Sequence, residues 1–143
     1  MAITQTLTDT FLQDCLDGGH NLGSGGNTLK IALYTSSATL GATTSAYSAT
    51  NEVSGTGYTA GGATLSSQAV AFDSSNNVAY FDAADPAFTT ATITARGALI
   101  YNNSKSNASI AVLDFGSDFT STAGTFTIQL PSAAYNTAII RIS

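Results

Sequence analysis

Hydrophobic residues near the start of the chain recur at helical spacing and form one apolar stripe, Leu7, Phe11, Leu12, Cys15 and Leu16. This pattern predicts a helix over about residues 4–17. Thr4 or Thr6 is suited to cap its start, and the pair Gly18-Gly19 to end it. We expect the stripe to pack against the rest of the protein, which makes Cys15 a core residue rather than a reactive thiol, because no neighbouring cation lowers its pKa.

After this segment the hydrophobic positions alternate with polar ones, which is the period of a β-strand. The turn residues 74–76 link two of the runs and predict a hairpin, and Gly97 inside the longest run predicts a bulge or a bend. We expect loops at 102–107 and 118–123. The predicted strands cover residues 28–35, 69–73, 77–83, 88–102, 109–116, 124–130 and 137–143.

The order of these elements predicts a single domain over residues 1–143. Many short strands without alternating helices are typical of an antiparallel β-sandwich, here of jelly-roll type with one N-terminal α-helix. Residues 36–50 are rich in Ser, Thr and Ala. We therefore expect an exposed arm or extended loop over about residues 36–64.

Charge is scarce in this chain and limits its partners. Charged residues make up 9% of the 143 positions, against about 25% in ordinary soluble domains. The net charge is −5, and the four basic residues are scattered. Binding to nucleic acid or to an anionic membrane surface needs clustered cations, so we expect neither partner. No apolar stretch approaches the length of a membrane span, and we identify no secretory signal.

The sequence offers no assembled catalytic or cofactor motif. The glycine-rich segment TNEVSGTGYTAGG (50–62) lacks the Lys of a phosphate-binding loop, and its glycines do not fit the dinucleotide spacing. His20 is the only histidine and is expected in a solvated or interface loop. A single cysteine excludes an internal disulfide and disfavours a zinc site. We therefore predict no catalytic residues, no cofactor and no metal.

The same glycine-rich segment is a candidate contact loop. Its density of glycine beside a lone tyrosine indicates a tightly turning segment at an interface, and we expect Gly55 and Gly57 to tolerate Ala in the isolated fold. Tyrosine is common at interfaces, which also keeps a glycan-binding face among the alternatives. The candidate interface residues are Tyr47, Glu52, Gly55, Gly57 and Tyr58.

Several blocks of the sequence, spread over nearly the whole chain, resemble a family of small virion structural proteins of tailed bacteriophages. The resemblance implies a virion component and supplies no catalytic motif. The blocks that carry it are MAITQTLTDTF, LKIALYTSSATLGATTSAYSATNEVSGTGYTAGG, TITARGALIYN, AVLDFGSDFTSTAGTFTIQLP and AIIRI.

Together with the weakly charged composition, this resemblance leads us to expect a capsid cement or decoration protein that bridges subunits of the phage major capsid protein. We expect a homo-oligomer, either a dimer or a trimer, that joins the virion during assembly in the host cytoplasm. The alternatives are a tail, neck or baseplate component that contacts other virion proteins, or a receptor-binding or glycan-binding module of the tail.

Overall fold

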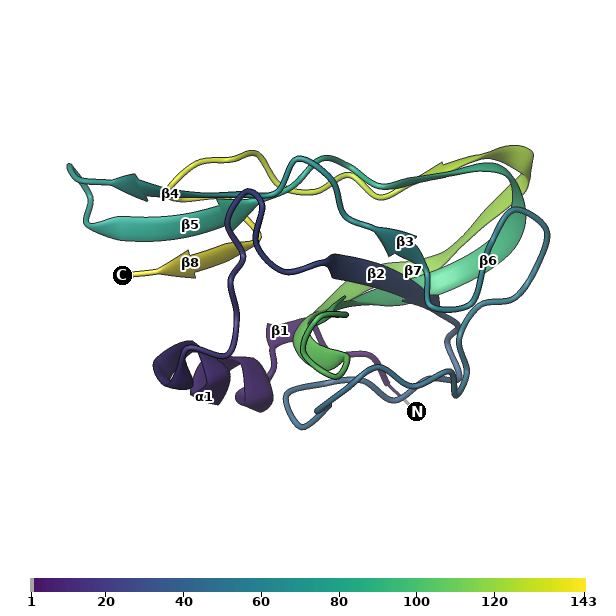
Figure 1. Ribbon diagram of the computed structural model, residues 1–143. Coiled ribbons are helices and arrows are strands. Elements are labelled where there is room, and N and C mark those ends of the chain that lie inside the picture. The colour runs from purple at the N-terminus through teal and green to yellow at the C-terminus, as the bar shows by residue number, and fades with distance from the viewer. Residues whose placement is uncertain (1) are drawn as a thin grey trace.

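The computed structural model describes residues 2–143 and is mainly β, with two antiparallel sheets and one short helix near the N-terminus (Figure 1). This confirms the predicted fold class. The elements are β1 (Thr6–Leu7), α1 (Asp9–Asp17), β2 (Leu29–Tyr34), β3 (Ala63–Thr64), β4 (Ala69–Asp73), β5 (Val78–Asp82), β6 (Ala87–Asn102), β7 (Ala108–Thr127) and β8 (Ile140–Ile142).

The larger sheet has the strand order β1-β7-β6-β2-β3 and is built around the long pair β6 and β7. At one end of this pair Ala87 lies opposite Thr127. At the other end Asn102 lies opposite Ala108. The register shifts just before Gly97, which confirms the predicted bulge.

The predicted loop at 118–123 is wrong. These residues belong to β7, which continues through them and stays paired with β6: Thr120 lies opposite Thr94 and Ser121 opposite Ile93. The two predicted strands on either side of this segment are therefore one strand. Both faces of β7 are largely exposed here, so its side chains do not alternate between hydrophobic and polar. The Ser and Thr residues of this segment therefore gave no strand pattern in the sequence.

The smaller sheet has the order β4-β5-β8, and the predicted hairpin is its β4–β5 pair. Phe81 of β5 and Ile140 of β8 belong to the same buried cluster as Ile31 and Ile100 of the larger sheet. The two sheets thus share one hydrophobic core, as in a sandwich. They are offset, and the hairpin end of the smaller sheet projects past the larger one (Figure 1).

Helix α1 begins at residue 9, not at residue 4. Thr8 is its cap, and its side-chain oxygen accepts a hydrogen bond from the Phe11 N–H. The residues before it are extended because β1 pairs with β7, with Leu7 opposite Ala111. The predicted end is confirmed: Gly18 adopts a left-handed conformation at the C-terminus of the helix.

Contrary to the prediction, most of the apolar stripe of the helix does not face the core. Phe11 is buried, but Leu12 is 52% exposed, Leu16 is 92% exposed and Cys15 is also exposed. The helix is short and contacts β7, where Phe11 is its one buried side chain and the buried cap residue Thr8 bonds to the Ile110 carbonyl. No helix within residues 2–143 is both long and apolar enough to cross a membrane.

The segment 36–64 has little regular structure but is not an exposed arm. Ala38, Leu40 and Val53 are buried in it. Isolated bridges tie it to the rest of the fold, including one between Thr56 and Thr92 of β6. The segment therefore folds back along the larger sheet, which places its polar residues next to β2 and β6.

The burial of the helix side chains gives a direct test. We expect Phe11→Ala to lower the free energy of unfolding by about 3–5 kcal/mol, because it removes a buried ring and leaves a cavity. We expect Leu12→Ala to cost about 1 kcal/mol or less, because half of that side chain already contacts water. Urea unfolding of both variants measures the difference. Equal losses would contradict this packing of the helix.

Candidate functional site

Three of the predicted interface residues meet in one hydrogen-bonded cluster around Glu52, the only glutamate of the chain. The Tyr58 hydroxyl donates to Glu52 Oε1 over 2.6 Å, and the Tyr47 hydroxyl donates to Glu52 Oε2 over 2.7 Å. The Gly61 N–H donates to Oε1 as well, over 2.8 Å. Three donors on one carboxylate make strong, charge-assisted bonds. We call Tyr47, Glu52, Tyr58 and Gly61 the Glu52 cluster.

The Glu52 cluster is attached to the larger sheet from two sides. On β2, the Leu33 N–H donates to the Tyr58 hydroxyl over 2.9 Å. On β6, the Tyr101 hydroxyl donates to the Gly61 carbonyl over 2.7 Å, and its ring stacks on that of Tyr47 at a centroid distance of 4.8 Å. The irregular segment is therefore held on the sheet by its own glutamate and tyrosines.

The tyrosines of the cluster remain protonated donors. Burial, followed by the hydrogen bond to Glu52, raises the pKa of Tyr47 to about 12. The same two causes in the same order raise the pKa of Tyr58 well above its usual range. An ionised phenol beside the carboxylate would be repelled by it. The arrangement is suited to fixing the segment and not to proton transfer near neutral pH.

Gly55 and Gly57 lie where the same segment crosses β6. A Cβ atom on Gly55 would lie 2.4 Å from the Thr92 carbonyl oxygen, and one on Gly57 would lie 2.6 Å from the Ala91 Cα. Gly57 also has a φ of +80°, which disfavours any side chain. The expectation that both positions tolerate Ala in the isolated fold is therefore wrong, because the backbone of β6 occupies the space.

The predicted contact loop is thus bound mainly to the larger sheet of its own chain. Tyr47, Glu52 and Tyr58 are half-buried, and their polar atoms bond to one another and to the sheet. The exposed residues of the loop are uncharged and mostly small: Thr50, Asn51, Ser54, Gly55, Thr56, Gly57, Thr59 and Ala60. A contact between this loop and a neighbouring protein stays a prediction.

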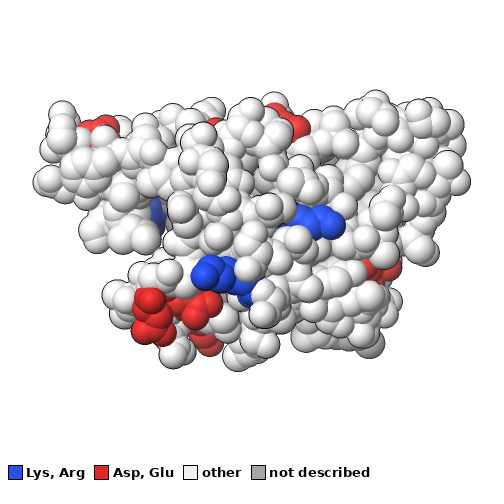
Figure 2. All heavy atoms as spheres, in the orientation of Figure 1, with Lys and Arg blue, Asp and Glu red and all other residues white. Residues whose placement is uncertain are grey.

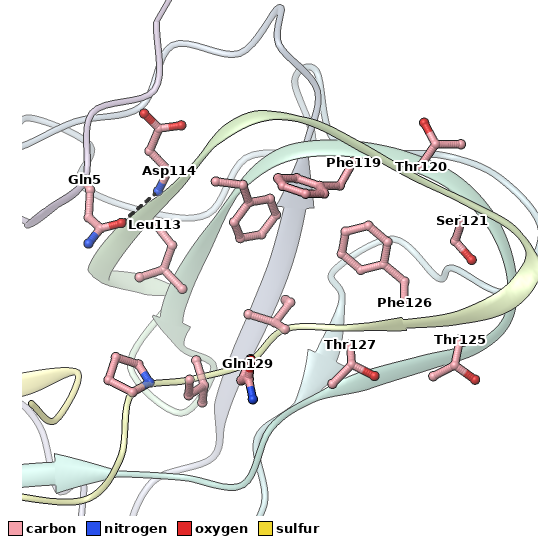
Figure 3. Close-up of a pocket in the computed structure, with 14 residues that line it drawn as sticks. Gln5, Leu113, Asp114, Phe119, Thr120, Ser121, Thr125, Phe126, Thr127 and Gln129 are labelled. Carbon is pink, nitrogen blue, oxygen red and sulfur yellow. Dashed lines mark hydrogen bonds between the residues drawn. The ribbon is translucent and has the colours of Figure 1, made fainter.

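A second feature is a groove of about 650 Å³ inside the bend of β7. The rings of Phe115 and Phe126 lie 6.3 Å apart at its wall. Phe119 meets Phe115 edge-on at 6.4 Å and is half exposed at the rim (Figure 3). Leu113 and Ile128 add apolar surface to the lining. The groove can accept an apolar or aromatic group.

At one edge of the groove, Asp114 and Gln5 are held by contacts within the fold. Asp114 Oδ1 accepts from the Gly116 N–H over 2.9 Å and lies 3.3 Å from Arg96 Nε. These contacts, the Gly116 bond first, hold the pKa of Asp114 below its usual range. The Asp114 N–H in turn donates to Gln5 Oε1 (Figure 3). Asp114 is therefore a charged anchor for the bend of β7.

No pattern in the sequence predicted this groove. Phe115, Phe119 and Phe126 are separated by four and seven residues, and the odd interval would place Phe126 on the opposite face of a regular strand from the other two. They converge because β7 bends, with positive φ values at Gly116 and Ala123. Glycine at position 116 was the only local signal of that bend.

His20 lies in the loop after α1, but its side chain is buried beside the helix, so the prediction that it is solvated is wrong. A role at an interface stays a prediction. The His20 ring packs on Phe11 at a centroid distance of 5.2 Å. Asn102 Nδ2 donates to His20 Nδ1 over 2.9 Å, and Nε2 lies 3.3 Å from Asp14 Oδ2 without hydrogen-bond geometry. Burial lowers the pKa of His20, and nearby Lys105 adds to this, against the opposing effect of Asp14.

Charged groups are sparse on the surface. The face in Figure 2 is almost entirely uncharged, and its most evident acidic group lies at the corner formed by α1. That helix carries Asp9, Asp14 and Asp17. Within residues 2–143, His, Cys, Asp and Glu side chains form no group of three or more that could hold a metal ion.

Comparison with known proteins identifies no relative: the chain matches no family model, no curated protein and no solved structure.

The Glu52 cluster predicts a large effect from one truncation. We expect Glu52→Ala to lower the free energy of unfolding by about 2–4 kcal/mol, because the Gly61 N–H and two phenols lose a charged acceptor. Hydrogen exchange should speed up first at Gly61 and Val53. Asp118→Ala is the matched control, because it removes an exposed carboxylate from β7. A loss no larger than that of the control would contradict the role of the cluster.

His20 gives the fold a defined pH dependence. Because its pKa is lowered in the folded protein, the unfolded chain binds the proton more readily. The free energy of unfolding should be highest above the ordinary pKa of 6.5 and should fall as the pH drops from about 7 to about 5. His20→Gln should flatten the curve in this range. The carboxylates with lowered pKa, Asp73 and Asp114, act only at more acidic pH. An unchanged slope would show that another group is responsible.

Proposed function

We propose that this chain is a non-enzymatic structural protein of a tailed-phage virion, and that its role is that of a capsid cement or decoration protein. The resemblance of several sequence blocks to small virion proteins supports this. The surface of the molecule is the observation on which the proposal mainly rests. Seven large apolar side chains are exposed on it, Leu12, Leu16, Val70, Phe72, Phe119, Tyr135 and Ile142.

These exposed side chains favour a role inside an assembly. Single apolar residues on a surface are ordinary, but here they accompany a chain with only 9% charged residues. A surface of this kind loses little when a neighbour covers it, because few charges have to be desolvated. A protein packed among capsid subunits requires that property.

The proposed mechanism is additive burial. Each copy covers part of a junction between major capsid protein subunits, with about 800 Å² per partner for a contact of standard size. Many copies then resist the pressure of the packaged genome together, although each contact is modest. The internal attachment of residues 36–64 suits this role, because a fixed segment loses little conformational entropy on binding.

The copy number in the virion tests this proposal. We expect quantitative mass spectrometry of purified particles to find this chain in hundreds of copies, in a simple ratio to the major capsid protein. Removal of the protein should leave heads that lose their DNA at a lower temperature. A few to some dozens of copies would place it in the tail, neck or baseplate instead. Absence from purified particles would overturn the structural role.

A further inference from the structure

We propose that two copies of this chain associate through the outer edge of β4, which pairs antiparallel with β4 of a second copy about a two-fold axis at Ala71. β4 is paired on one side only, with β5. Among residues 2–143 no strand or isolated bridge lies on its other side. Its backbone N–H and C=O groups on that side are therefore available to another strand.

The other sheet edges are less suitable for pairing. β1 and β3, at the edges of the larger sheet, have two residues each. β8 has three, and its central residue is Arg141, so a two-fold pairing would set this cation opposite its own copy. β4 has five residues, of which Ala69, Val70, Ala71 and Phe72 are uncharged and exposed. β7 is also open on its outer side beyond Val112, but it carries Asp114 and Asp118 and bends at Gly116 and Ala123, which interrupts a regular pairing edge.

The β4 sequence is complementary to itself in the full-length antiparallel register. With Ala71 at the axis, Val70 of one copy lies opposite Phe72 of the other. Ala69 lies opposite Asp73, so that no two carboxylates face each other. Aromatic and β-branched residues stabilise each other when they are opposite on one face of a sheet. A second copy of this chain therefore fits the edge better than an unrelated charged strand.

The side chains that this pairing covers are those that the monomer leaves open. Val70 is opposite Phe81 in the β4–β5 register and so shares its face, the face that packs on the core. Phe81 is 2% exposed, yet Val70 opposite it is 53% exposed, because β4 is the edge strand of the sheet. Phe72, nearer the hairpin end that extends past the larger sheet, is 63% exposed (Figure 1). The two-fold axis reverses the strand direction. Each projecting Phe72 then lies beside Val70 of the other copy, next to that copy's core.

The size of the contact sets its strength. A standard interface buries about 800 Å² of surface on each partner. A five-residue strand with two large apolar side chains buries less than this. We therefore expect a weak dimer, with a dissociation constant of roughly 0.1–1 mM. Such a contact becomes effective where many copies are held close together. The dimer does not depend on the proposed place in a virion, because the isolated chain contains both halves of the contact.

Sedimentation equilibrium tests the association. We expect the mass to rise from monomer towards dimer as the concentration increases to about 2 mM, which exceeds the expected dissociation constant. Phe72→Lys should weaken association at least tenfold. Leu16→Lys, which alters an even more exposed side chain on α1, should leave it unchanged. A monomer at every concentration, or equal effects of the two variants, would overturn the proposal.

Cysteine cross-linking tests the register. In a Cys15→Ser background, Ala71→Cys should give a disulfide-linked dimer with oxidised glutathione, because the two Cα atoms would lie about 4.5–5.5 Å apart. Ser75→Cys, in the hairpin turn, should give no such dimer, because the two cysteines at position 75 would lie more than about 20 Å apart. A mixture of Ala69→Cys and Asp73→Cys chains should form the mixed dimer. Equal cross-linking of Ser75→Cys and Ala71→Cys would contradict the two-fold pairing. These outcomes are independent of the copy number in virions.

Discussion

The long antiparallel pairing of β6 with β7 supports the larger sheet and the segments that are attached to it. β2 pairs with β6, and β1 pairs with β7. The buried Thr8 at the start of α1 bonds to Ser109 of β7 through its hydroxyl, and its N–H donates to the Ile110 carbonyl. The segment 36–64 reaches β6 through the Thr56–Thr92 bridge. Because few charges are available, backbone pairing and apolar burial provide most of the order.

Polar residues in this protein act mainly as attachments between irregular segments and this framework. Glu52 binds the segment 36–64 to β2 and β6 through tyrosines, and Gln68 Nε2 donates to three carbonyls of the loop after α1. Asn102 links His20 and Asn27 at the end of β6. Each group has defined partners, as buried or half-buried polar groups require. This use of scarce polar groups leaves a largely uncharged surface.

The offset between the two sheets connects the fold with the proposed association. Phe81 and Ile140 belong to the shared core, but the same face of the smaller sheet continues beyond it to Phe72 and Ile142. A sandwich with fully aligned sheets would bury this face within the chain. In this protein that part of the face stays exposed, and it lies next to the edge of β4, whose interior residues carry no charge. The proposed association would use this face without requiring additional residues.

The sequence by itself determined the β class, the hairpin around residues 74–76, the bulge at Gly97 and the end of the helix at Gly18, because each depends on local periodicity or on glycine conformation. Tertiary structure decided the rest. The outward orientation of Leu12, the continuity of β7 and the convergence of its phenylalanines depend on contacts between distant segments. The same holds for the Glu52 cluster. Composition showed that its residues were unusual, but only the folded sheet brought the donors to the carboxylate, since hydrogen bonds over long sequence separations leave no local pattern.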